Sequence, residues 1–175
     1  MTTLLLTAIL AIAPALDQAA APAANQTIGS VRGMTDRVKG YLTKAAAQVP
    51  EDQYAFKPTP EVRSMGEVFA HVADANFGIC GMVSGDKPPM SGIEKTKKTK
   101  AEITEALTAS FAFCEKVFDS MTDARANEVV PKFFVPGTHT RLGVLAFNAA
   151  HDFEHYGNIV TYMRLKGMVP PSSAR

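Results

Sequence analysis

The sequence predicts an all-α protein built as a four-helix bundle. Four segments carry apolar residues at steps of three and four, the spacing that lines one face of an α-helix. Two of these segments begin with a capping box, formed by Ser64 with Glu67 and by Thr99 with Glu102. No segment shows a convincing strand pattern of alternating apolar and polar residues. Amphipathic helices bury their apolar faces most simply against one another, which favours a bundle.

Length and composition are those of one ordinary globular domain. The chain has 175 residues, of which 46% are apolar and 20% charged, and it leaves no room for a second large core. Its formal net charge is +1, so nothing at this level favours nucleic acid or an acidic membrane as a partner. A short lysine cluster is expected to be a solvated loop that leads into a helix: Lys95, Lys97, Lys98 and Lys100.

Residues 1–24 are interpreted as a secretory signal peptide. An apolar run from Leu4 to Ile12 precedes alanines at positions 19–21, which provide an A-x-A-type cleavage region. The run is too short to span a membrane, and no cysteine follows it to support a lipid anchor. An Ala-rich leader is the alternative, because the segment before the run contains no Lys or Arg. We expect an exported protein, periplasmic or secreted, without a stable membrane anchor, whose bundle domain comprises residues 25–175.

The first helix is predicted from Thr27 to Gln48. Its buried stripe is formed by apolar residues three and four positions apart: Ile28, Val31, Met34, Val38, Tyr41, Leu42, Ala45 and Val49. Pro50 ends it, and residues 50–63 contain three prolines, which indicates an extended connection.

A second helix begins after Ser64 and has an apolar line of its own: Val68, Val72, Ala75 and Ile79. His71 lies about 60° from Val68 around the helix axis, so it is expected to face the bundle interior or its rim. Glycines and prolines in residues 81–89 end the helix, and residues 84–98 are expected to form a polar loop.

The third helix follows Thr99, and its apolar seam has a strict spacing: Ile103, Leu107, Ser110, Cys114, Val117 and Met121. Cys114 is therefore expected to be a small buried side chain. If this helix runs antiparallel to the second, Cys80 and Cys114 lie on the order of 15 Å apart, beyond disulfide reach. We expect two free thiols on that basis, although a parallel pairing would weaken the argument.

The last helix is predicted from Thr140 to Lys166, before Gly167 and two prolines. Upstream of it, Pro131 and the Pro136–Gly137 pair mark turns, and Phe133 to Val135 are expected to pack over one end of the bundle. The main apolar stripe of the helix is formed by Leu142, Leu145, Ala149, Phe153, Tyr156, Val160 and Met163. His151 and His155 lie beside this stripe, where the helix would face a groove between its neighbours.

Three of the four histidines in the chain can be placed at one metal site. His151 and His155 are four residues apart, so a helix places both imidazoles on one face. A third ligand, His71, would arrive from another helix. Three neutral imidazoles leave a coordination position open, as in catalytic zinc sites, where a water molecule can be activated. The alternative is a histidine satisfied in the core or at its rim, together with a pair that occurs by chance.

Three further side chains are candidates to support such a site. Asp74, almost one turn after His71, can orient an imidazole N–H or be a solvated charge. Asn158 and Tyr162 share the sector of the histidine pair, so they are candidates to bind substrate or are ordinary rim residues. No catalytic acid or base is assigned from the sequence.

Other polar residues are interpreted more simply. Glu154 lies about 100° from His155, which favours a surface role over that of a general base. His139 precedes the last helix and is expected to be an exposed loop residue, although it could approach a metal as a fourth ligand. Arg63 is expected to tie the connecting segment to a helix end or a carboxylate.

Two longer segments carry a family resemblance. FKPTPEVRSMGEVFAHVADAN (residues 56–76) resembles the entry to the second helix of DinB-like (YfiT-like) proteins, and HDFEHYGNIVTYMRLKGMVPPSS (residues 151–173) resembles the end of their fourth. The similarity covers essentially the whole mature chain. It implies an up-up-down-down bundle with a long crossover connection, frequent homodimers, and a divalent metal, often zinc or nickel. The implied ligands are His71, His151 and His155.

The resemblance also bears on function. Known activities in the family include thiol-dependent transferases and isomerases, but an exported chain would lack a reduced pool of small thiols. Two hypotheses follow: a metal-dependent hydrolase or transferase that acts on a small molecule, or a non-catalytic, stress-associated metal-binding module. No basic stripe or recognition helix supports binding to DNA.

Overall fold

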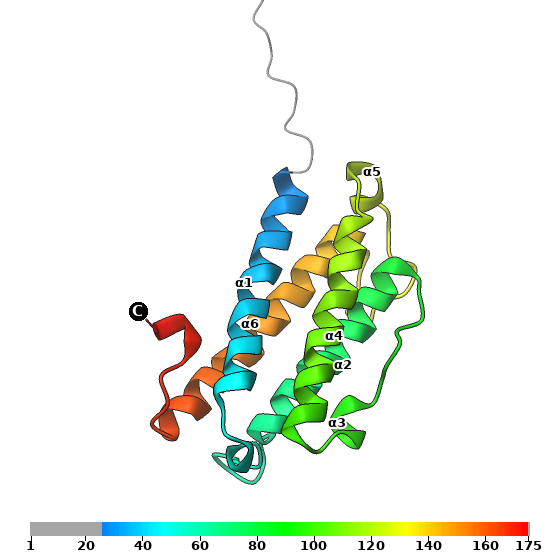
Figure 1. The fold of residues 1–175 in the computed structure, drawn as a ribbon. Helices are drawn as coiled ribbons and strands as arrows, with labels where there is room; N and C mark the ends of the chain where they lie inside the picture. The colour runs from blue at the N-terminus through cyan, green and yellow to red at the C-terminus, as the bar shows by residue number, and fades with distance from the viewer. Residues whose placement is uncertain (1–25, 175) are drawn as a thin grey trace, which may run out of the picture.

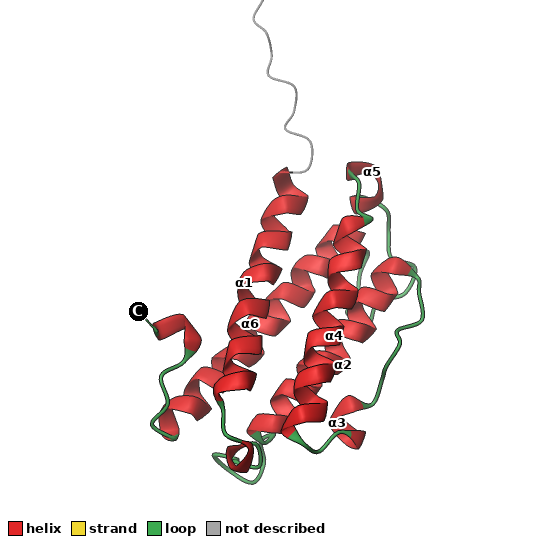
Figure 2. Cartoon of the chain, in the orientation of Figure 1, coloured by secondary structure: helices red, strands yellow, loops and turns green. Residues whose placement is uncertain are grey.

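Four long helices form the frame of the protein in the computed structural model, which describes residues 26–174 (Figure 1). They are α1 (Gln26–Gln48), α2 (Met65–Ser84), α4 (Lys100–Asp119) and α6 (Arg141–Leu165). Two single-turn helices, α3 (Ile93–Thr96) and α5 (Asp123–Ala126), and two 3-10 turns, Glu51–Gln53 and Pro171–Ser173, lie in the connections. Between residues 26 and 174 there is no strand, and one isolated antiparallel bridge joins Val129 to Thr140 (Figure 2). The expected all-α class is confirmed.

Local signals set the helix boundaries. The Ser64 hydroxyl accepts a hydrogen bond from the Glu67 amide at 3.2 Å, and the Glu67 carboxylate accepts one from the Ser64 amide at 2.7 Å. Thr99 and Glu102 form the second predicted capping box in the same way. Each satisfied amide would otherwise lack a partner at a helix N-terminus. The predicted helices α1, α2, α4 and α6 are therefore confirmed, with ends that differ by at most one or two residues. The predicted polar loop contains one addition, the short helix α3.

Contacts between helices define their directions. Arg32 near the start of α1 pairs with Asp119 at the end of α4 at 2.8 Å, so these two helices are antiparallel. By contrast, α2 and α4 are parallel, because Asn76 contacts Ser110 and Cys80 contacts Cys114 with the same offset of 34 residues. The last helix, α6, runs antiparallel to α2, and its Asn148 donates to Asn76 at 2.7 Å.

The order along the chain is therefore up-down-down-up rather than the expected up-up-down-down. Two consecutive parallel helices require the chain to return along the bundle between them. Residues 85–99 make this return over the outside of the molecule (Figure 1), so the expected long crossover connection is present. An α2 of 20 residues is about 30 Å long, a distance that this loop spans because an extended chain covers about 3.3 Å per residue.

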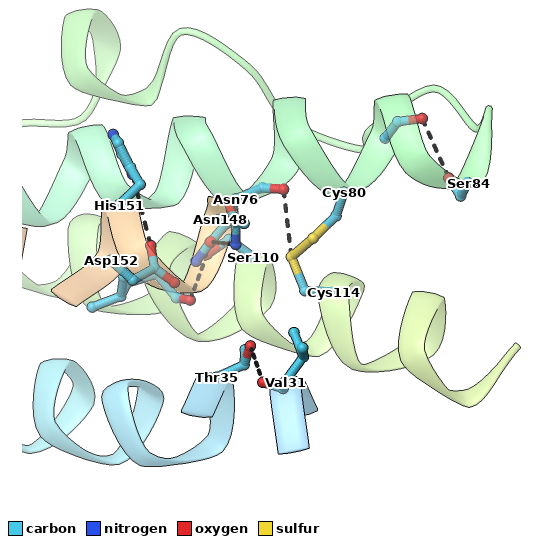
Figure 3. Close-up of a disulfide and its surroundings, with 12 residues drawn as sticks. Val31, Thr35, Asn76, Cys80, Ser84, Ser110, Cys114, Asn148, His151 and Asp152 are labelled. Carbon is cyan, nitrogen blue, oxygen red and sulfur yellow. Dashed lines mark hydrogen bonds and ion pairs between the residues drawn. A yellow bond between two sulfur atoms is a disulfide. The ribbon is translucent and has the colours of Figure 1, made fainter. Parts of the chain in front are cut away.

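The two cysteines form a disulfide, Cys80–Cys114, with Cα atoms 5.4 Å apart (Figure 3). The prediction of two free thiols is wrong, because it assumed an antiparallel pairing of the helices that carry them. In the parallel arrangement both cysteines lie about one turn before the end of their helices, at the same level of the bundle. Cys114 is fully buried, as predicted.

The buried core fills the space between the four long helices in two connected regions. One surrounds Leu42, Phe69 and Phe111, and the other surrounds the disulfide and Leu145. The predicted apolar stripes supply about half of the buried apolar side chains, and Met34, which they include, is 45% exposed. Several of the largest buried side chains lie outside the predicted stripes, among them Phe69, Phe77 and Phe111. Phe133 and Phe134 pack on Phe147 of α6 with ring centroids 5.3 and 5.6 Å away. No helix within the described residues is sufficiently long and apolar to cross a membrane.

One sequence expectation falls outside this description. The signal peptide, residues 1–24, lies outside the residues that the structure describes.

Candidate metal centre

Three histidines from two helices converge on one point of the bundle. His71 comes from α2, and His151 and His155 come from α6. The ring centroids are 5.3 Å apart for His71 and His151, 4.7 Å for His71 and His155, and 4.4 Å for the α6 pair. Potential ligand nitrogens of all three lie within 4.8 Å of one another. The structure thus brings together the three residues that the sequence singled out.

The antiparallel packing of α2 and α6 places His71 opposite the α6 pair. On one side of the cluster, Asn148 of α6 bonds Asn76 of α2 at 2.7 Å. On the other side, the Tyr162 hydroxyl donates to the carbonyl oxygen of Arg63, just before α2, at 3.1 Å. These two contacts fix the register of the helices, and the i, i+4 spacing then sets His151 and His155 on the facing side.

The Nδ1 atoms of two of the rings have hydrogen-bond partners. His155 Nδ1 lies 3.2 Å from Asn158 Oδ1, and His71 Nδ1 lies 3.2 Å from Glu94 Oε2. The Nε2 atoms of His151 and His155 face each other within the cluster, 3.0 Å apart. A ring that donates from Nδ1 keeps its Nε2 lone pair free for a ligand.

Glu94, and not Asp74, contacts the imidazole of His71. Orienting an imidazole was one of the two roles that the sequence allowed for Asp74. The Asp74 carboxylate instead accepts hydrogen bonds from the amides of Ile93 and Glu94, both at 2.9 Å, at the start of α3. This anchors α3 against α2 and holds Glu94 beside His71. The sequence could not indicate this contact, because Glu94 lies 23 residues from His71 in a loop.

Arg63 holds the other side of the Glu94 carboxylate. Its Nε donates to Glu94 Oε1 at 2.8 Å, so Arg63 ties the connecting segment to a carboxylate, as predicted. Glu94 thereby joins the segment before α2, the crossover loop and His71 in one polar network.

His139 does not join the cluster. Its Nε2 lies 3.1 Å from the carbonyl oxygens of Val135 and Pro136, and its ring packs against Phe133. Among residues 26–174, no fourth histidine, cysteine or carboxylate belongs to the three-histidine group.

A pocket of about 580 Å³ opens beside His155. Its polar lining includes Arg63, Glu94, Glu154, Asn158 and Tyr162. Glu154 is exposed, as predicted, at the rim of this pocket. A larger groove of about 740 Å³ between α1 and α4 contains no histidine or cysteine, so it offers no comparable chemistry.

Burial shifts the pKa values of the ionisable groups in and beside the cluster. It lowers the pKa of His155 to about 4, and the neighbouring His151 contributes to the same effect. Burial also lowers the pKa of His71, assisted by the Arg63 charge. Both rings are therefore neutral at pH 7, which is the protonation state that a metal ligand requires. The same desolvation raises the pKa of Asp152, next to His151, to about 6.

The donor set fits a divalent metal ion. Zinc binds imidazole nitrogen at about 2.0–2.1 Å, which places two tetrahedral ligands roughly 3.3 Å apart. The observed Nε2–Nε2 distance of 3.0 Å is close to this value, and the neutral rings present lone pairs rather than protons to the centre. Imidazole donors suit zinc, nickel, copper and iron alike, so the ligands by themselves do not select one metal.

Comparisons with known proteins bear on the family and the fold of the chain. A sequence model of the DinB superfamily matches residues 34–159. A conserved protein from Enterococcus faecalis has a similar structure, with a TM-score of 0.65 and 18% identity over 78% of this chain and 95% of that one. A DinB-like protein from Bacillus cereus gives a TM-score of 0.72 and 16% identity over 82% and 95% of the two chains.

A DinB-like protein from Bacillus subtilis is also similar, with a TM-score of 0.66 and 16% identity over 83% of this chain and 99% of that chain. At these identities the solved structures establish a shared fold alone. None of the curated proteins matches the chain.

Proposed function

The chain belongs to the DinB superfamily, and from this premise we propose that it binds a divalent metal ion through His71, His151 and His155. The observation that carries the proposal is the convergence of three imidazoles from two helices, with ligand nitrogens within 4.8 Å. Lowered pKa values at His71 and His155 support it, because both rings are neutral at pH 7. Zinc and nickel are the ions that we favour, because both accept imidazole ligands.

We further propose that the site is catalytic and acts on a small molecule. Three protein ligands leave a coordination position open, as in catalytic rather than structural zinc sites. The adjoining pocket of about 580 Å³ has the size of a small-molecule site. An ion bound there supplies activation of a nucleophile near neutral pH, which suits a hydrolase or transferase. Around it, Asn158 and Tyr162 offer polar groups that can orient a substrate.

The proposed location is outside the cytoplasm, in the periplasm or the medium. The apolar run and small residues before position 25 support export. The Cys80–Cys114 disulfide supports it independently, since such bonds persist in oxidising compartments. A reaction that consumes a reduced small thiol is disfavoured there, so hydrolysis is the preferred reaction class.

Metal content tests the site. The full chain, purified without a histidine tag, is expected to carry a stoichiometric divalent ion by elemental analysis. His155→Ala removes one of three ligands and is expected to lose most of that metal. His139→Ala is the matched control, because this histidine lies outside the cluster. Equal metal content in the wild type and His155→Ala would refute the proposed site.

A substrate screen separates catalysis from a non-catalytic role. The metal-loaded protein is to be assayed against ester, amide and thiol-transfer substrates, with His155→Ala as the inactive control. Turnover that requires both the metal and His155 is expected for esters or amides. A protein that retains its metal but turns over none of these substrates would instead support the non-catalytic, stress-associated module.

A further inference from the structure

Asp152 is a buried carboxylate with no assigned role in the proposed metal site. Its side chain is 0% exposed, and neither of its oxygens has a hydrogen-bond partner among the described residues. Figure 3 shows it turned toward His151, with His151 Nδ1 3.9 Å from Asp152 Oδ1. A carboxylate that is removed from water and left unpaired is strongly unfavourable. Its retention at this position calls for a specific partner.

The buried atoms without a partner include one potential donor to the ionised carboxylate. Asn148 Oδ1 also lacks a partner, but it is an acceptor and cannot bond a second acceptor. The Asn148 amide nitrogen donates one of its two hydrogens to Asn76, and it makes no hydrogen bond to Asp152. His151 Nδ1 is the remaining buried atom without a partner, and it can donate when it carries the ring proton.

The other two histidines show the pattern that His151 would complete. In each of them Nδ1 faces a side-chain oxygen, from Glu94 beside His71 and from Asn158 beside His155. His151 has the same arrangement of groups, with Nε2 toward the cluster and Nδ1 toward Asp152, at a longer distance.

We propose that Asp152 is the positioning residue of His151: its carboxylate accepts a hydrogen bond from Nδ1–H and so directs the Nε2 lone pair toward the metal. This inference rests on the proposed metal site. A carboxylate in this position fixes the tautomer and orientation of the ring and makes its ligand nitrogen more basic. The contact comes from the buried side of α6, so solvent does not compete for it.

Metal affinity of a matched pair of variants tests the proposal. Asp152→Asn keeps the shape of the side chain but removes its charge, and it is expected to weaken zinc binding by about 10–100-fold in a competition titration. The visible spectrum of the cobalt-substituted variant is expected to shift, because the orientation of one ligand changes. Thr35→Val removes a buried hydroxyl of α1 that donates only to the Val31 carbonyl oxygen of its own helix, and its zinc affinity is expected to match the wild type.

A measurement on the unmodified protein makes the test independent of how the variants fold. In ¹⁵N NMR spectra of the metal-free full chain at neutral pH, His151 is expected as the Nδ1–H tautomer. A predominant Nε2–H tautomer would overturn the proposal, as would wild-type zinc affinity in Asp152→Asn. An equal loss of affinity in Thr35→Val would also overturn it, because the effect would then come from core packing. Failure of the wild type to bind metal would instead refute the metal site, while the tautomer still reports on the Asp152–His151 pair.

Discussion

Burial acts in opposite directions on two residues of α6 that lie within one turn. It lowers the pKa of His155 to about 4 and raises that of Asp152 to about 6. The titratable groups around His155 are His151 and Glu154 on α6 and His71 on α2, whereas Asp152 faces His151. In each case desolvation is the largest cause, because the protein interior disfavours the charged form of either group.

The stability of the metal-free protein is therefore expected to vary little between about pH 4 and 6. In this window unfolded His155 binds a proton that the folded state excludes, so its contribution to stability rises with pH. Folded Asp152 holds a proton that the unfolded chain has lost, so its contribution falls as pH rises. Asp152→Asn removes the second effect. The free energy of unfolding of this variant is therefore expected to rise with pH, by on the order of 1–3 kcal/mol between about pH 4 and 6.

Urea denaturation in the presence of a chelator, repeated from pH 4.5 to 6.5, measures this difference. His139→Ala serves as a control, because that residue contacts neither group. Parallel pH profiles for the wild type and Asp152→Asn would contradict the expected opposition of the two residues.

At the scale of elements, the single-turn helix α3 holds the Glu94 carboxylate beside the metal cluster. Asp74 accepts from two amides at the start of α3, and this places Glu94 against His71 and Arg63. The position of the crossover loop and the orientation of His71 therefore both depend on the Asp74 side chain of α2. We expect α3 to lose its position when that anchor is removed.

Asp74→Ala is accordingly expected to lower both stability and metal affinity. Two partly buried hydrogen bonds are lost, which costs about 1–3 kcal/mol, and Glu94 is no longer held beside His71. Glu94→Gln is expected to weaken metal binding alone, because α3 keeps its anchor. Denaturant titration and zinc competition separate the two effects, and Asp86→Ala in the same loop is the control. Wild-type affinity in Asp74→Ala, together with weakened binding in Glu94→Gln, would show that α3 holds Glu94 without Asp74.

At the scale of the whole molecule, the parallel pairing of α2 and α4 is locked by the disulfide. Cys80 and Cys114 are 34 residues apart in sequence and join the two helices that the long crossover separates. Closing a loop of this length restricts the unfolded chain, which in the loop-entropy model stabilises the fold by about 3–4 kcal/mol. Along α2, Cys80 lies about two and a half turns beyond His71, on the far side of Asn76.

The double variant Cys80→Ala, Cys114→Ala is expected to lose about 3–4 kcal/mol of stability and to keep its metal affinity. Denaturant titrations of this variant and of the wild type, with and without a reductant, measure the loss. The reductant is expected to affect the wild type only. Detection of two free thiols in the denatured wild-type protein would contradict the disulfide itself.

Local features were predictable from the sequence because they depend on residues a few positions apart. The capping boxes at Ser64 and Thr99, the helix periodicity, and the shared face of His151 and His155 all arise within one or two turns. His71 was a candidate third ligand from its place on the second helix, and the family resemblance implied the same three ligands. The signal peptide and the identity of the metal stay predictions.

The tertiary structure decided what depends on how the helices run past one another. The parallel direction of α2 and α4 brings Cys80 to Cys114, a contact that helical spacing alone leaves open. The return of the crossover loop brings Glu94 to His71, and the packing of α6 buries Asp152 beside His151. The amino-acid sequence thus determined the helices and the histidines, because hydrogen bonds and side-chain periodicity within a helix are local. Only the packed bundle determined their partners, because burial and contact between distant segments exist only once the chain has folded.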